Sequence, residues 1–134
     1  MAAPEGRSLL LIMAREMASN LATPMLVVDP VGTLVFYNEA AEILLGQSFA
    51  VTGPVASTEW GGDMFHPEDL DGNPISLDDL PLAKVIRERR PAHAAFFITG
   101  LDGVRRSIAA TSFPLFAKPD ELAGAVAVFW DVAG

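Results

Sequence analysis

Three β-rich segments separated by short turns fill the C-terminal third of the chain, at residues 92–99, 104–116 and 123–132. Leu101-Asp102-Gly103 separates the first two, and Lys118-Pro119-Asp120-Glu121 separates the last two. Glycine, proline and aspartate favour turns, and short turns join antiparallel neighbours. This feature constrains the fold most, because it predicts an antiparallel sheet on which the rest of the chain has to pack.

A second hairpin is predicted nearer the N-terminus. The segments Met25–Asp29 and Thr33–Tyr37 are rich in strand-forming residues, and Pro30 and Gly32 mark the turn between them. A short helix should follow, because Asn38 suits an N-cap and Gly46 suits the C-terminal cap.

The middle of the chain is expected to be mostly loop and helix. Residues 47–79 are rich in Gly, Pro, Ser and Asp, which predicts loops and short helical turns. Leu80–Arg90 predicts a longer helix that Pro91 ends. The expected fold class is therefore α+β, with a five-stranded antiparallel sheet and helices on one face.

Ser8–Leu21 predicts an N-terminal flanking helix with Ser8 as its N-cap. Its apolar surface is broad, and the stripe at helical spacing consists of Leu10, Met13, Met17 and Leu21. Such a helix packs on its own domain or on another chain, and we take the stripe as a candidate dimer interface. The expected division is a flanking and dimerisation helix over residues 1–21 and a domain over residues 22–134.

The composition is apolar for a small domain. Of the 134 residues 51% are hydrophobic and 19% charged, and the mean hydropathy is +0.34. No apolar run reaches the roughly 18–20 residues of a membrane span, because Arg15-Glu16 follows Leu9–Ala14. The same run lacks the cleavage pattern of a secretory signal. The excess apolar surface is therefore expected to line a ligand cavity or a partner interface.

Charge and cysteine content exclude several functions. The net charge of −8 repels a phosphate backbone, so we expect no direct nucleic-acid partner. With no cysteine, the chain has no disulfide, no thiolate metal site and no cysteine-linked chromophore. This composition is compatible with a cytoplasmic protein.

A series of short motifs, in this order and spacing, resembles the PAS domain from about Leu21 to Val132. The motifs are Asp29 with Gly32 three residues on, Phe36-Tyr37-Asn38 with Ala40-Ala41 and Leu45-Gly46, His66-Pro67-Glu68-Asp69, Asp71-Gly72-Asn73-Pro74, Asp102-Gly103, Phe113-Pro114-Leu115, and Trp130-Asp131-Val132. The resemblance implies a PAS fold and a cytoplasmic, non-enzymatic sensory or interaction module. It also implies a variable ligand cavity, and a homodimer formed through the helix before the first strand.

The resemblance also concerns the two ends of the chain. It implies that a signal leaves through the flanking helix or the last strand, which makes Trp130 and Asp131 candidate relay residues. Ala133 stands where the family often has threonine, and the sequence stops at Gly134. A standalone protein and a truncated N-terminal domain both stay open, and Met1 fits either.

Cofactor chemistry finds little support in the sequence. The resemblance places the haem ligand of oxygen sensors on the Leu80–Arg90 helix, which has no histidine, while His66 and His93 lie elsewhere. Histidine-ligated haem and covalent flavin are therefore not expected, although a non-covalent flavin stays open. The acidic run at residues 69–73 lacks the glycine and glutamate positions of a calcium loop, so no metal site is predicted.

Four bulky apolar residues are candidate walls of a cavity: Val85, Ile86, Phe97 and Phe129. They lie on elements that face one another in the PAS arrangement, although plain core packing is the alternative. Alanines at 94, 95, 109, 110, 125 and 127 leave volume on a concave sheet. If a ligand is present, we expect an elongated hydrophobic molecule such as a fatty acid.

The leading functional hypothesis is a sensory module that regulates a signal-transduction or transcription-control partner. One alternative is a small-molecule enzyme on an α+β cone of the ketosteroid-isomerase type, which needs a buried carboxylate base and an oxyanion partner such as Tyr37. A ligand-free structural adaptor with a filled core is the other alternative.

Overall fold

The fold is a single sheet with helices on both sides, and the computed structural model describes residues 5–132. The elements in chain order are α1 (Glu5–Ser19), β1 (Met25–Val28), β2 (Leu34–Tyr37), α2 (Glu39–Leu45), α3 (Phe49–Thr52), α4 (Ser57–Trp60), the 3₁₀ helix η1 (Leu77–Asp79), α5 (Pro81–Glu88), β3 (Ala92–Thr99), β4 (Arg105–Lys118) and β5 (Glu121–Asp131). The predicted flanking segment (residues 1–21) and the predicted domain (residues 22–134) each extend beyond the described residues, by residues 1–4 and 133–134 respectively.

The five strands form one antiparallel sheet in the order β2-β1-β5-β4-β3. The N-terminal hairpin therefore joins the three C-terminal strands at the centre of the sheet, where β1 pairs with β5 and Met25 lies opposite Val128. The expected α+β class, the five strands and the helices between β2 and β3 are confirmed.

The helix boundaries differ from those expected. Because α1 already begins at Glu5, Ser8 lies inside the helix and the prediction that it is the N-cap was wrong. A local capping preference does not determine where a helix starts when tertiary packing stabilises it. At the other end α1 stops at Ser19, so Leu21 follows the helix.

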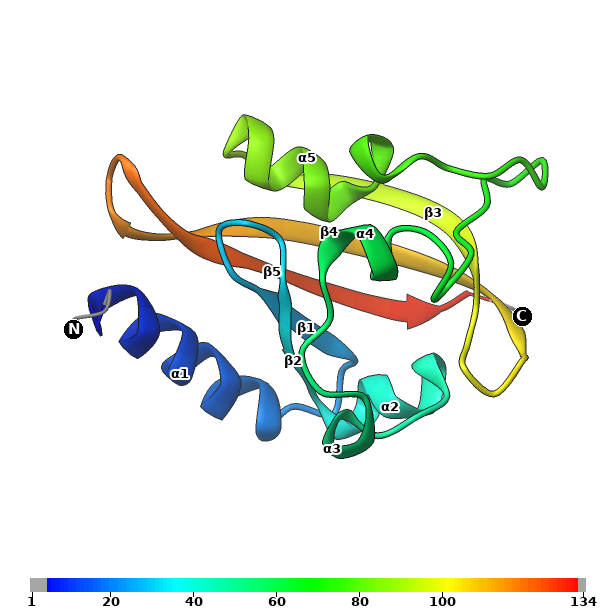
Figure 1. Cartoon of the computed structure of the whole chain (residues 1–134), viewed down its shortest axis with the longest axis horizontal. Helices are drawn as coiled ribbons and strands as arrows, with labels where there is room; N and C mark the ends of the chain where they lie inside the picture. Colours follow the sequence, from blue (N-terminus) through cyan, green and yellow to red (C-terminus); the bar gives the residue numbers. More distant parts are fainter. Residues whose placement is uncertain (1–4, 133–134) are drawn as a thin grey trace.

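The sheet separates two apolar layers. On its inner face, Phe96, Ile98 and Phe129 pack with residues of α2, α4 and α5 in the larger core. On its outer face α1 packs through Ala14 and Ala18 against a second cluster, which contains Met25, Val27 and Val126. Figure 1 shows α1 and α5 on opposite sides of the sheet. The flanking helix is thus part of the packed domain.

The buried side chain of Asn38 joins α1, β1 and α2. Its Oδ1 accepts hydrogen bonds from the backbone N–H groups of Met25 at the start of β1 and of Ala41 in α2, both at 3.0 Å. Its Nδ2 donates to the carbonyl of Ala18 in α1 at 3.0 Å and to that of Thr23 at 2.8 Å. The predicted N-cap is confirmed. The same amide also fastens α1 to the strands.

We expect Asn38→Ala to lower the free energy of unfolding by roughly 3 kcal/mol, because it leaves several buried backbone groups without partners. Urea denaturation measures this change. The control is Asn20→Ala, whose amide makes one exposed hydrogen bond to Glu16, and it should change stability by less than about 0.5 kcal/mol. Equal losses for the two variants would contradict the role given to Asn38.

Gly124 on β5 allows both β1 and α1 to lie close to β5. Its φ is +154°, and a Cβ there would collide with the carbonyl oxygen of Val28 and lie 3.0 Å from Cδ2 of Leu11. A side chain at this position would push both β1 and α1 away.

We expect Gly124→Ala to cost at least about 3 kcal/mol, because backbone strain adds to the collision. The control is Gly72→Ala, since Gly72 also has a positive φ of +88° but nothing within 4 Å of its Cβ position. That variant should lose only about 1–2 kcal/mol. Thermal unfolding that ranks the two variants the other way would show that α1 is not held closely at Gly124.

Candidate functional site

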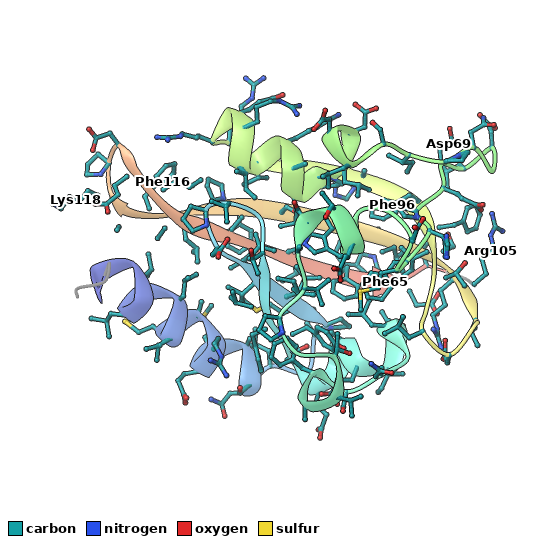
Figure 2. The ribbon with its side chains drawn as sticks, viewed as in Figure 1. Phe65, Asp69, Phe96, Arg105, Phe116 and Lys118 are labelled. Atoms are coloured by element: carbon teal, nitrogen blue, oxygen red, sulfur yellow. The ribbon has the colours of Figure 1, made fainter. Side chains whose placement is uncertain are left out.

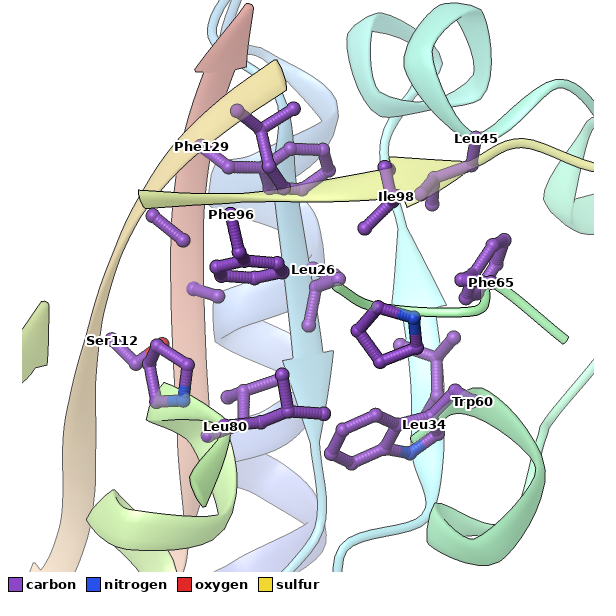
Figure 3. Close-up of a pocket in the computed structure, with 16 residues that line it drawn as sticks. Leu26, Leu34, Leu45, Trp60, Phe65, Leu80, Phe96, Ile98, Ser112 and Phe129 are labelled. Atoms are coloured by element: carbon purple, nitrogen blue, oxygen red, sulfur yellow. The ribbon is translucent and has the colours of Figure 1, made fainter. Parts of the chain in front are cut away.

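A cavity of about 80 Å³ lies between the inner face of the sheet and the helical connection. Its lining is apolar except for the Ser112 hydroxyl and the indole N–H of Trp60. The lining residues are Leu26, Leu34, Leu45, Trp60, Phe65, Pro67, Leu80, Pro81, Leu82, Phe96, Ile98, Ile108, Ala110, Ser112, Ala127 and Phe129. Figure 3 shows these side chains converging from the sheet, from the start of α5 and from the segment around α4.

Small side chains on the central strands create this space. Ala110 and Ala127 line its floor, and in register Ser112 pairs with Ala92 on β3 and with Ala127 on β5. Three short side chains in one row leave volume that larger residues would fill. On the opposite side, the indole of Trp60 is fixed because its Nε1 donates to the carbonyl of Gly32 at 2.8 Å.

Ser112 is the polar group of the cavity. Its residue is fully buried, and its Oγ has no hydrogen-bond partner within residues 5–132. Leaving a buried hydroxyl unpaired costs roughly 1–3 kcal/mol, so most such groups in folded proteins are paired. In Figure 3 Ser112 stands at one edge of the lining, whereas Phe65 stands at the other.

The outer surface of α1 is the second candidate site. Leu9, Ile12, Met13 and Met17 are each more than half exposed. The helix therefore buries Ala14 and Ala18 and exposes these four large side chains. In the part of the chain that the structure describes, no helix is long and apolar enough to cross a membrane.

Comparisons with known proteins give matches in structure only. No family model and no curated protein matches the sequence. Among solved structures, the chain is similar to the PAS domain of Bordetella pertussis BvgS, with 17% identity, a TM-score of 0.60, and coverage of 93% of this chain and 87% of that one. The chain has a PAS fold.

Two further neighbours share this PAS fold. The PAS domain of the fruit-fly ELK potassium channel has a TM-score of 0.70 at 11% identity, with coverage of 92% of this chain and 98% of that one. The LOV domain of the Erythrobacter litoralis EL346 blue-light activated histidine kinase has a TM-score of 0.64 at 18% identity, with coverage of 86% and 100%.

The predicted cavity wall agrees only in part with this PAS cavity. Phe129 lines it, but Val85, Ile86 and Phe97 do not. Val85 is buried in the larger core, and Ile86 is partly buried against it. Phe97 lies on the other face of β3, beneath the guanidinium of Arg105 (labelled in Figure 2), whose Cζ is 3.8 Å from the ring centroid. Alternate residues of a strand point to opposite faces, so Phe96 and Ile98 take the inner positions instead.

The remaining predicted site residues lie on the outer side of the PAS fold. Met13, Met17 and Leu21 are exposed, whereas Leu10 is half-buried. The ring of Trp130 is 6.5 Å from that of His93, centroid to centroid, and Asp131 pairs with Ile108 at the end of β5. Their roles in dimerisation and signal relay stay predictions.

The cavity residues do not fit haem or flavin. His66 and His93 are both exposed and neither lines the cavity, so neither stands where an axial haem ligand is needed. A flavin brings many polar atoms, and the lining offers one unpaired hydroxyl for them. Among the described residues no group of three or more His, Asp or Glu side chains is placed to hold a metal ion.

Tyr37, the candidate oxyanion partner, lies outside the cavity lining. Its hydroxyl donates to the carbonyl of Gln47 and shares a hydrogen bond with the Thr52 hydroxyl, both at 2.8 Å. Burial raises the pKa of Tyr37 above its ordinary value of 10.0; the bond to Thr52 opposes the rise, and the charge of Glu42 adds to it. These contacts indicate a structural hydroxyl.

We expect the protein to lose stability as the pH rises above about 10, because the raised pKa of Tyr37 keeps it neutral in the folded state while the unfolded chain ionises. The stabilisation is fully present below the unfolded pKa and is lost as the pH rises through the folded one. Urea denaturation at several alkaline pH values measures it. In Tyr37→Phe this part of the pH dependence should disappear, and an unchanged pH dependence would contradict the assignment.

Proposed function

We propose that this chain is a non-enzymatic sensory module that binds a small molecule in its cavity, forms a homodimer through α1 and regulates a signalling or transcription-control partner. The observation that carries the proposal is the pair of apolar surfaces on opposite sides of one sheet. One lines the cavity and suits a ligand, while the other is exposed on α1 and suits a protein partner.

The chemistry of the cavity supports binding over catalysis. None of its sixteen lining residues is an acid, a base or a tyrosine, so the cavity has no group that transfers a proton near neutral pH. An enzyme of the ketosteroid-isomerase type needs a buried carboxylate there. The open volume also favours a sensor over an adaptor with a filled core.

The packing supplies a short route between the two surfaces. Ala127 and Phe129 line the cavity from β5, and Gly124 on the same strand lies against Leu11 of α1. A ligand that shifts β5 also shifts α1, because α1 packs against this strand. The shift of α1 then biases the equilibrium between two conformations of the dimer. Trp130 and Asp131 at the end of β5 are the second exit in this proposal.

The solved neighbours are compatible with a regulatory role. Two of them are domains of a blue-light activated histidine kinase and of a potassium channel. PAS folds therefore accompany different outputs, and the output of this chain is proposed here only as a class.

We expect the double variant Met13→Glu, Met17→Glu to be monomeric and folded, because both side chains are exposed and their charges would meet across a dimer. Leu10 is left unchanged because it is half-buried, so a charge there would disturb the domain itself. Light scattering gives the mass, and circular dichroism confirms the fold.

The control is Ile43→Glu, which places one such charge on α2 at a side chain that is 70% exposed. It should leave the dimer intact. A wild-type protein that is monomeric at high concentration, or a double variant that stays dimeric, would refute the proposed interface.

A further inference from the structure

The buried hydroxyl of Ser112 has a free hydrogen-bonding capacity at a place where the protein offers it no partner. Its neighbours in register, Ala92 and Ala127, carry no polar side-chain atoms. Trp60 carries the other side-chain polar atom of the lining, and its Nε1 is already bonded to the carbonyl of Gly32. A molecule in the cavity that carries one polar atom would therefore find its partner at Ser112, once the side chains that cover its Oγ shift to expose it.

Water does not satisfy this site well. A buried water needs two to four polar partners and roughly 10–15 Å³ of space. The cavity, at about 80 Å³, has the space, but its lining offers one unpartnered side-chain hydroxyl among apolar groups. An apolar body with one hydrogen-bonding atom fits the lining better than a cluster of water molecules.

The lining also selects against an ionised head group. No arginine, lysine or histidine lines the cavity, so a carboxylate bound there would be buried without a counter-charge. Arg106 is the half-buried cation nearby in sequence, and its guanidinium already bonds to the carbonyl of Leu44 and to Asp102. The cavity therefore favours a neutral, compact ligand over the fatty acid expected from the sequence.

We propose that Ser112 is the polar anchor of the cavity, and that its ligand class is a neutral molecule of about one aromatic ring with a single hydrogen-bonding oxygen or nitrogen. This proposal rests on the proposed sensory function and names the ligand class of that site. The apolar body of the ligand packs against Leu26, Leu80 and Phe96.

Phenol and toluene are matched probes for this anchor, because they share a ring and differ by a hydroxyl in place of a methyl group. Isothermal titration calorimetry with the wild-type protein and with Ser112→Ala measures four affinities. We expect the variant to weaken phenol roughly five- to tenfold, which is the worth of one buried hydrogen bond, and to leave toluene within about twofold.

A second variant locates the probes. Ala110→Ile fills the cavity from β4, next to Ser112 on the same face, and should abolish binding of both compounds. Ser112→Ala should remain folded, because it removes an unpaired hydroxyl and adds no bulk. If Ser112→Ala does not fold, the wild-type protein alone tests the anchor. After each binding free energy is corrected for the cost of removing that compound from water, phenol should bind more tightly than toluene.

Three results would overturn the anchor. Equal losses of phenol and toluene in Ser112→Ala would assign Ser112 a steric role, and undiminished phenol binding would remove it from the site; both leave a ligand-binding sensor in place. Failure of the wild-type protein to bind either compound would refute the ligand class. The dimer of the proposed function is tested separately through α1, so the two failures are distinguishable.

Discussion

The amide of Asn38 holds together the parts of the chain that the sheet alone does not join. Backbone ladders connect β1 to β2 and to β5 without involving α1. The position of α1 across the outer face depends on Nδ2 of Asn38, which reaches the carbonyls of Ala18 and Thr23, while Oδ1 holds β1 and α2. This buried side chain, together with the packing of Ala14 and Ala18, thus fixes the angle between the flanking helix and the sheet.

That angle decides which apolar surface is covered and which is exposed. With α1 seated over Gly124 and Val126, the helix faces the sheet with Leu11, Ala14 and Ala18. Its larger residues, such as Met13 and Met17, then point away from the domain. Part of the apolar excess of the composition is therefore exposed on α1, and another part surrounds the cavity on the opposite face. In the PAS fold, the exposed apolar surface of α1 and the apolar lining of the cavity thus lie on opposite faces of one sheet.

Local patterns in the sequence predicted the strands, the hairpins and the cap at Asn38, because each depends on residues close together in the chain. The link from Asn38 to Ala18 was not predictable in this way, since the two residues are 20 positions apart. The burial of small residues on α1 was missed for a related reason. Hydropathy favours burying Leu and Met, whereas close backbone approach at Gly124 favours Ala.

The sequence predicted an apolar cavity against the sheet, but of the four candidate wall residues only Phe129 lines it. On β3, Phe96, Phe97 and Ile98 are consecutive and apolar, so the sequence carries no alternation that says which of them face inward. The register of β3 against β4 decides it, and Phe97 turns outward toward Arg105. Trp60 and Phe65 come from the irregular connection, where no periodicity exists. Ser112 gave no signal because a single serine in a strand is ordinary until its burial is known.

The central claim is that occupancy of the cavity is transmitted through β5 to α1. Two-dimensional amide NMR of the labelled protein during a phenol titration tests it most directly. The account predicts saturable shifts at Ser112 and Ala127 that continue through Gly124 into α1, while the turn at residues 69–73 stays unchanged. Shifts confined to exposed residues, or shifts at the cavity with none in α1, would contradict it.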